Sequence, residues 1–139
     1  MEVRAFRSAD ESAVVELWKL CGLVVPWNDP AQDIKRKLTV QPEMFLVGCA
    51  CGRVIASVMA GYDGHRGWIN YLAVHPDYRR AGLGRLMITA VESLLLDSGC
   101  PKVNLQVRRS NTAAMEFYGA IDYMEDDVVS FGKRLVSDS

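Results

Sequence analysis

The sequence lacks the residues and patterns that mark several specialised classes of binding protein. It has two histidines and four cysteines, and no Cys-x-x-Cys pair, so no metal site is expected. Acidic and basic side chains nearly balance at 17 against 16, which gives no general attraction to nucleic acid. No apolar run approaches the ~20 residues of a membrane span, and Met1-Glu-Val-Arg does not resemble a signal peptide. We therefore expect neither nucleic acid nor membrane as a partner.

The cysteines also bear on the compartment. Cys21, Cys49, Cys51 and Cys100 are interpreted as buried free thiols, with Cys49 and Cys51 on one face of a strand. Free thiols indicate a reducing, cytoplasmic setting. The length of 139 residues and the apolar fraction of 50% predict one globular domain over residues 1–139.

Hydrophobic periodicity predicts a mixed α+β chain in the order β-α-α-β-β-β-α-β-α-β. A capping box of Ser8 and Glu11 is expected to open the first helix, and Asp29-Pro30 the second. The strand at 68–74 is apolar on both faces and is therefore predicted to be central. The predicted strands are 2–6, 44–50, 54–61, 68–74, 102–107 and one or two within 123–135. The predicted helices are 9–20, 30–38, 83–97 and 111–120, the third with a sheet-facing stripe of Leu83, Leu86, Met87, Ala90, Val91, Leu94 and Leu95.

The most informative stretch is Leu72-Ala-Val-His-Pro-Asp-Tyr-Arg-Arg-Ala-Gly-Leu-Gly84. It joins an apolar strand to an amphipathic helix through an Arg pair and two glycines. A helix start leaves several backbone N–H groups without intrahelical partners, and its dipole favours negative charge. Gly82 and Gly84 remove side chains that would keep an anion away from these groups. The stretch predicts a site for a phosphate-bearing ligand; the alternative is a helix start with two flexible glycines.

Two common phosphate motifs are absent. The third glycine of a dinucleotide fingerprint would fall on Met87, and the Gly-Lys-Ser/Thr of a P-loop does not occur. The remaining Arg-x-x-Gly-x-Gly pattern, Arg79 to Gly84, resembles the acyl-CoA-binding motif of the GCN5-related N-acetyltransferase (GNAT) superfamily. The element order resembles that family along essentially the whole chain, which implies a largely antiparallel central sheet flanked by about four helices. The segments 26–30, 61–67 and 132–135 resemble the bacterial YpeA-like subgroup.

The resemblance implies which residues bind acetyl-CoA or CoA. The backbone of Leu72, Ala73 and Val74 would face the pantetheine arm and the thioester, with an N–H at Ala73 or Val74 stabilising the carbonyl oxygen. The pyrophosphate would lie on the loop formed by Arg79, Arg80, Ala81, Gly82, Leu83, Gly84 and Arg85.

A second motif, Asn111-x-x-Ala114-x-x-x-Tyr118, follows the strand at 102–107. Asn111 is expected to cap a helix on which Ala114 and Tyr118 share its face. In the family, the Asn lies near the pantetheine or pyrophosphate arm, and the Tyr hydroxyl lies near the thioester sulfur. The alternative for Tyr118 is an aromatic side chain that anchors helix to sheet. The sequence departs from the family at Asp122, where a glycine is usual, and Asp tolerates the left-handed backbone such a position needs.

The sequence leaves the general base open. Many members of the family carry a Glu on the central strands, but here no Glu occurs between Glu43 and Glu92. Asp63 and His65 are the nearest candidates, although His65 is equally well explained as a surface-turn residue. The acceptor side is predicted to include Trp27, Asn28, Asp29 and Trp68, with core packing as the alternative for both tryptophans.

The motifs and the resemblance to the GNAT family together predict an acetyl-CoA-dependent N-acetyltransferase. It would transfer an acetyl group to a primary amine, of a small molecule or of a protein or peptide, by direct attack in a ternary complex. The alternative is a non-catalytic acyl-CoA-binding or sensing module on the same fold. The sequence leaves a homodimer open as a partner arrangement.

Overall fold

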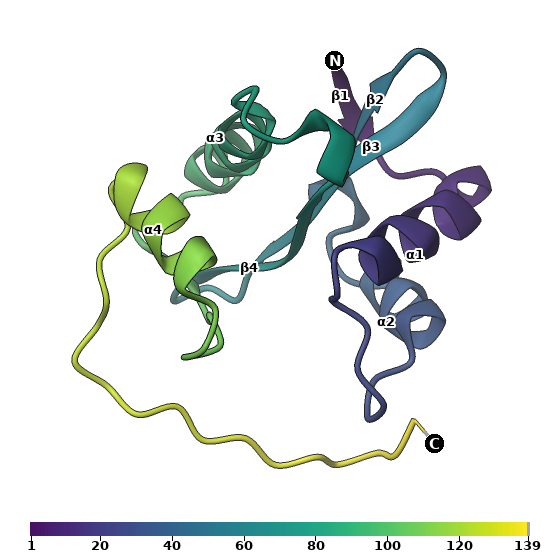
Figure 1. Ribbon diagram of the computed structural model, residues 1–139. Helices are drawn as coiled ribbons and strands as arrows, with labels where there is room; N and C mark the ends of the chain where they lie inside the picture. Colours follow the sequence, from purple (N-terminus) through teal and green to yellow (C-terminus); the bar gives the residue numbers. More distant parts are fainter. Residues whose placement is uncertain (139) are drawn as a thin grey trace. The chain divides into compact units, whose positions relative to one another are not determined.

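The computed structural model describes residues 1–138, which form two compact units: Met1–Leu105 together with Asp138, and Gln106–Ser137 (Figure 1). None of the described helices is long and apolar enough to cross a bilayer. The first unit contains β1 (Glu2–Ala5), α1 (Glu11–Leu20), α2 (Pro30–Lys37), β2 (Phe45–Ala50), β3 (Arg53–Tyr62), β4 (Gly67–Val74), α3 (Leu83–Asp97) and β5 (Val103–Leu105). Short 3₁₀ turns lie at Ser8–Asp10, Pro42–Met44 and Pro76–Tyr78. The second unit contains α4 (Thr112–Ala120).

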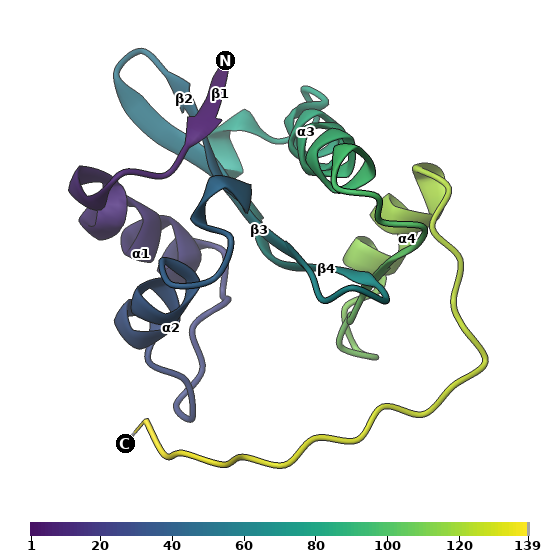
Figure 2. The same cartoon turned by 180° about the vertical axis from the view of Figure 1, so that it is seen from behind.

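The five strands form one sheet in the order β1-β2-β3-β4-β5. All neighbours are antiparallel except β4 and β5, which are parallel. Helices α1 and α2 cover one face of the sheet and α3 covers the other (Figures 1 and 2). The predicted mixed, largely antiparallel sheet is therefore confirmed, but the middle strand is β3 and not the strand at 68–74.

Each face of the sheet packs on its own layer of side chains. On the α1 side, Trp18 is fully buried and stacks on Phe45 and Tyr71, with ring centroids 6.3 and 3.8 Å apart. On the α3 side, the buried residues are Met87, Ile88, Val91 and Leu95. The predicted stripe on α3 is wrong at Leu86, which is 52% exposed, and it omitted the buried Ile88.

The ends of α1 and α2 follow local rules. The Asp29 side chain accepts a hydrogen bond from the Ala31 N–H at 3.0 Å, which confirms it as the cap of α2. Gly22, at φ +70°, ends α1 in a Schellman motif, in which the Leu23 N–H donates to the Trp18 carbonyl. At the start of α1, the predicted Ser8–Glu11 box does not form. Asp10 accepts from the Arg7 N–H instead, and Arg4 binds it with two hydrogen bonds of 2.7 and 2.9 Å.

Two other expectations are wrong. Among the described residues after Ala120, none lies in a strand, so the predicted strand within 123–135 does not form. Of the four free cysteines only Cys100 is buried. Cys51 is exposed, because it is in the turn between β2 and β3 with φ +51°, and therefore does not share a strand face with Cys49.

Candidate functional site

The N-terminus of α3 has no side-chain cap. Its N-cap residue is Gly82, at φ +76°, and the first backbone bond of the helix is from the Leu86 N–H to the Gly82 carbonyl. The N–H groups of Leu83, Gly84 and Arg85 precede that bond and have no intrahelical acceptor. A Cβ added at Gly82 would meet nothing within 4 Å, so the positive φ, and not crowding within the chain, is what requires glycine. These N–H groups together with the helix dipole suit an anion.

The three arginines of this loop differ in their contacts. The Arg79 guanidinium donates through Nε to the Val74 carbonyl at 3.1 Å and lies 3.5 Å from the Cys21 sulfur. It therefore holds the loop to the end of β4. Arg80, at φ +65°, and Arg85 are exposed and have no partner within residues 1–138. Their charges are free to attract a phosphate.

The end of β4 has an open edge. β5 pairs with β4 only from Gly67 to Ile69, and no other described strand continues along that side. The His75 N–H donates to the Ile55 carbonyl at 2.7 Å, so in an antiparallel ladder the peptide groups of Val74 point away from β3. By the same alternation those of Leu72 point away and those of Ala73 point toward β3. Of the expected backbone contacts, the peptide groups of Leu72 and the N–H of Val74 are therefore available to a ligand. The Val74 carbonyl already accepts hydrogen bonds from Arg79 Nε and the Cys21 thiol.

Asp63, His65 and Trp68 gather at the opposite end of β4. Asp63 accepts from the N–H groups of His65 and Arg66, both at 2.8 Å, and from Trp68 Nε1 at 3.3 Å. These bonds, those from the backbone above all, hold the pKa of Asp63 below its usual range. Five residues of strand, about 17 Å, separate Gly67 from Leu72. Asp63, His65 and Trp68 therefore lie at the opposite end of β4 from Leu72–Val74, the stretch at which the carbonyl is expected.

The connection from α1 to α2 carries the other predicted acceptor residues. Trp27 is 57% exposed, and the Asn28 N–H donates to the Val25 carbonyl at 3.1 Å. One carboxylate oxygen of Asp29 caps α2, and the backbone N–H of Asp29 donates to the Asp138 carboxylate at 3.0 Å. Asp29 is thus engaged in holding the helix start, and Trp27 offers an exposed aromatic face.

In the second unit, the Asn111 side chain caps α4, accepting from the Ala114 N–H at 3.1 Å. The Tyr118 ring packs edge-on against Phe117 and Tyr123, with centroids 5.0 and 5.6 Å away. Burial raises the pKa of Tyr118 to about 12, so its hydroxyl stays protonated at neutral pH. The arrangement therefore favours Tyr118 as a hydrogen-bond donor.

The departure from the family pattern at Asp122 leaves the end of α4 regular. Asp122 has φ +74°, as expected for this position. The Tyr123 N–H donates to the Tyr118 carbonyl at 2.9 Å and the Asp122 N–H to the Gly119 carbonyl at 3.3 Å, which is a Schellman motif. Asp here replaces the usual glycine without changing the motif.

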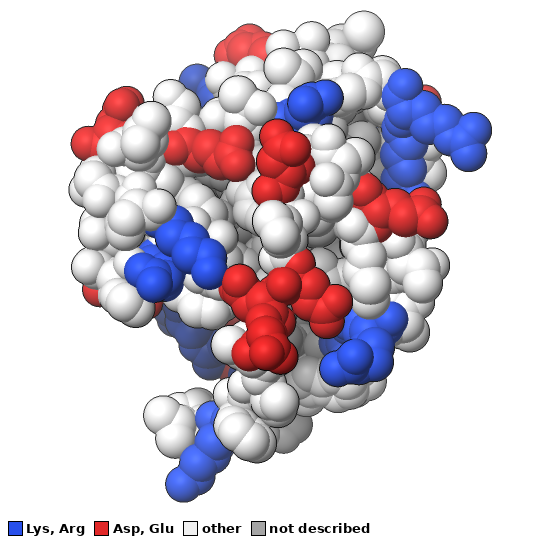
Figure 3. Space-filling model, turned by 90° about the vertical axis from the view of Figure 1, so that its left-hand side faces the viewer, with Lys and Arg blue, Asp and Glu red and all other residues white. Residues whose placement is uncertain are grey.

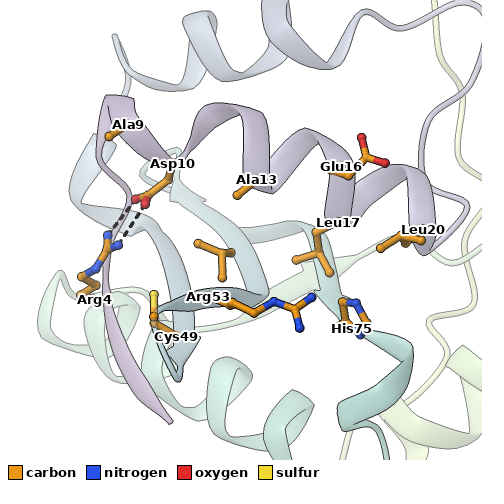
Figure 4. Close-up of a pocket in the computed structure, with 12 residues that line it drawn as sticks. Arg4, Ala9, Asp10, Ala13, Glu16, Leu17, Leu20, Cys49, Arg53 and His75 are labelled. Atoms are coloured by element: carbon orange, nitrogen blue, oxygen red, sulfur yellow. Dashed lines mark hydrogen bonds and ion pairs between the residues drawn. The ribbon is translucent and has the colours of Figure 1, made fainter.

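A groove of about 400 Å³ lies between α1 and the hairpin of β2 and β3. In Figure 4, Arg53 and His75 lie on the side of this groove opposite Glu16, and the Arg4–Asp10 pair is at one end. His75 Nδ1 accepts from the Asp77 N–H at 3.1 Å, so this histidine orders the turn that leads to the Arg79 loop. The face in Figure 3 carries acidic and basic side chains in separate small groups, in keeping with the balanced net charge.

Comparison with known proteins decides the family. A profile of the acetyltransferase (GNAT) family matches residues 12–123. The chain belongs to this family. It is 49% identical over 139 residues to an acetyltransferase of Sodalis glossinidius and 47% identical over 138 to one of Pectobacterium atrosepticum, covering 99% of this chain and 98% of each relative. The GNAT chain is accordingly an N-acetyltransferase.

Solved structures share the GNAT fold. The ribosomal-protein-S18-alanine N-acetyltransferase of Escherichia coli aligns with a TM-score of 0.74 and 23% identity, over 90% of this chain and 78% of the other. An aminoglycoside N-acetyltransferase, AAC(6')-Iy, solved in complex with CoA, aligns with a TM-score of 0.74 and 18% identity, over 96% and 99%. At these identities the likeness supports the fold alone.

Proposed function

We propose that this chain transfers an acetyl group from acetyl-CoA to a primary amine by direct attack in a ternary complex. The observation that carries the proposal is the uncapped N-terminus of α3, where the N–H groups of Leu83, Gly84 and Arg85 have no intrahelical acceptor and two free arginines flank them. This arrangement suits the pyrophosphate of CoA. The AAC(6')-Iy structure, which shares this fold, holds CoA, and membership of the acetyltransferase family supports the same cofactor for this chain.

The acyl group would lie along the open edge of β4. The peptide groups of Leu72 and Val74 face that edge, and an N–H aimed at the thioester carbonyl would stabilise the charge that develops on its oxygen. Alternation along the strand favours Val74 over Ala73 for this role. Because Arg79 Nε and the Cys21 thiol both donate to the Val74 carbonyl, pantetheine binding would involve either the Val74 N–H alone or displacement of these donors.

Tyr118 is proposed to assist departure of the CoA thiolate. A thiol has a pKa of about 8.5, so full proton transfer from a phenol of pKa about 12 would be uphill by about 5 kcal/mol. A hydrogen bond from the neutral hydroxyl to the sulfur stabilises the leaving thiolate without that cost. Asn111 and Ala114, on the same face of α4, are proposed to contact the pantetheine or pyrophosphate arm.

The test is a CoA-release assay with acetyl-CoA and a panel of amines: spermidine, an aminoglycoside, a lysine peptide and a peptide with a free N-terminal alanine. Wild-type protein should release CoA with at least one of them. Tyr118→Phe should lower kcat at least about tenfold and leave acetyl-CoA affinity unchanged, while Tyr62→Phe, at the far end of β3, should alter neither. Equal loss of affinity and turnover in Tyr118→Phe would refute the leaving-group role.

The second candidate is a non-catalytic acyl-CoA-binding or sensing module on the same fold. It shares the open N-terminus of α3, so acetyl-CoA binding alone does not separate the two. Tight binding of acetyl-CoA with no CoA release for any amine of the panel would favour the sensing module.

A further inference from the structure

Tyr71 and Asp33 form a phenol–carboxylate pair beside the open edge of β4. The Tyr71 hydroxyl donates to Asp33 Oδ2 at 2.6 Å, a short and charge-assisted bond. Tyr71 directly precedes Leu72, and adjacent Cα atoms lie about 3.8 Å apart. The Tyr71 backbone therefore adjoins the edge at which the acyl group is proposed to bind, and its side chain extends from there to Asp33 on α2.

The backbone at Tyr71 is strained. Ser57 pairs with Ala73 and Met59 with Asn70, so β4 holds one more residue than β3 across this interval. The extra residue is accommodated at Tyr71, whose φ of +54° costs an L-residue about 1–2 kcal/mol. A bulky aromatic residue in this conformation is rare, and such strain clusters at functional sites.

A buried network holds the strained residue. Trp18 Nε1 donates to the Ser57 hydroxyl at 2.9 Å, and that hydroxyl donates to the Tyr71 carbonyl at 3.0 Å. The Tyr71 ring also stacks on Trp18, with an interplanar angle of 11°. Ser57 and Trp18 thus fix the backbone and the ring, and the bond between the phenol and Asp33 is not needed for either purpose.

The charges around the phenol come from α2 and from the end of the chain. Asp33 Oδ1 accepts from Arg36 at 3.4 Å, and Arg36 binds the Asp138 carboxylate at 2.7 Å. The Arg36 guanidinium therefore binds two carboxylates, and its contact with Asp33 is the longer and weaker of the two. An acidic group that is only partly compensated, and whose partner Tyr71 adjoins the proposed acyl site, suits a cationic or proton-donating ligand.

We propose that Tyr71 and Asp33 form the proton-accepting pair for the acceptor amine. The inference deepens the proposed function and rests on it. The amine first loses its ammonium proton to solvent. As its neutral nitrogen bonds to the acetyl carbon, one N–H proton passes to the Tyr71 oxygen and the Tyr71 proton passes to Asp33 Oδ2. The carbon–sulfur bond breaks, and CoA leaves as its thiolate. This pair fills the role for which the sequence offers no Glu on the central strands.

Burial and the neighbouring Asp33 both raise the pKa of Tyr71. The phenol is therefore neutral when the amine arrives, and it accepts one proton only as it gives up its own. Asp33 is necessary to the pair because the phenol alone has no group to which to pass its proton.

The experiment compares Tyr71→Phe and Asp33→Asn with wild type and with Tyr62→Phe, using the amine panel above. Asparagine at position 33 can still accept the phenol's hydrogen bond, so this variant retains the geometry but not the proton acceptor. Both variants should lose about 10²-fold in kcat while acetyl-CoA affinity stays near wild type, and because each removes or weakens the charge-assisted bond, the unfolding midpoint should fall by a few degrees in both. Their kcat should also rise about tenfold per pH unit over the range in which wild type is flat, because hydroxide then removes the proton.

Three results separate the outcomes. Unchanged pH–rate profiles in both variants of an active enzyme would overturn the pair and leave the proposed function intact. Loss of acetyl-CoA affinity in proportion to kcat would also overturn it, because that would be a structural effect. No turnover of any amine by wild type that binds acetyl-CoA would count against the proposed function itself, and against the pair with it.

Discussion

The substitution Gly82→Ala tests whether the α3 N-terminus binds the phosphates of acetyl-CoA. Gly52→Ala is its matched control. Both glycines have a left-handed backbone, with φ +76° and +74°, and at both an added Cβ would meet nothing within 4 Å. Alanine at either position should therefore cost about 1 kcal/mol of folding stability through backbone strain alone. For a domain of this size that lowers the unfolding midpoint by about 3–5 °C.

The two variants should differ only toward acetyl-CoA. The Cβ at residue 82 would stand at the open helix end, whereas Gly52 is in the turn between β2 and β3. Calorimetric titration should show a Kd for acetyl-CoA at least about tenfold weaker in Gly82→Ala, equivalent to about 1.4 kcal/mol. Gly52→Ala should bind as wild type does. Equal affinities in the two variants would refute the phosphate-loop reasoning, whatever their stabilities.

Three further predictions concern single side chains. Asp10→Asn should lower the free energy of unfolding by about 2 kcal/mol at pH 7, since it replaces a buried carboxylate bound by Arg4. Arg4 holds the pKa of Asp10 below its usual range, so this stabilisation is present above the unfolded-state pKa of about 3.9 and is lost as the pH falls below it. In a chemical-denaturation series, the difference in unfolding free energy between wild type and variant should therefore close below about pH 4. Asp122→Gly should raise the unfolding free energy by about 0.5–1 kcal/mol because glycine suits φ +74° better, and a lower midpoint than wild type would argue against the Schellman assignment. His65→Ala should leave the pH–rate profile unchanged, since the hydrogen bond from His65 to Asp63 is made by the backbone N–H and survives the substitution. If the variant no longer shows the rise of rate with pH that wild type shows, His65 would again be a candidate base.

Local sequence signals predicted the local structure well. Asp29-Pro30 at a helix start and Asp122 in the left-handed region both follow from the chemistry of one or two residues. The Arg-x-x-Gly-x-Gly stretch likewise predicted the strand, loop and open helix start that the structure has. In each case the preference of the backbone is decided within a single turn.

Features that depend on distant pairing were not predictable. The bulge at Tyr71 arises because the register between β3 and β4 shifts by one residue there. The residues next to Tyr71 in the sequence carry no signal of that shift. The hydrogen-bond partner of Tyr71, Asp33, is 38 residues away along the chain. The sequence did place Asp63 and His65 next to β4, but only the direction of the strand shows that they lie at the opposite end from Leu72–Val74. The segment 123–135 has a strand-like apolar pattern, yet no described strand forms there, and Phe131 is 93% exposed.

Binding of acetyl-CoA at the α3 N-terminus is tested most directly by a backbone amide NMR titration of the protein with acetyl-CoA. The largest shifts should fall on the amides of Leu83, Gly84 and Arg85, with those of Leu72 and Val74 shifting at the same ligand concentration. Saturable binding that leaves the amides of residues 83–85 unmoved, and shifts amides elsewhere, would contradict binding at the α3 N-terminus.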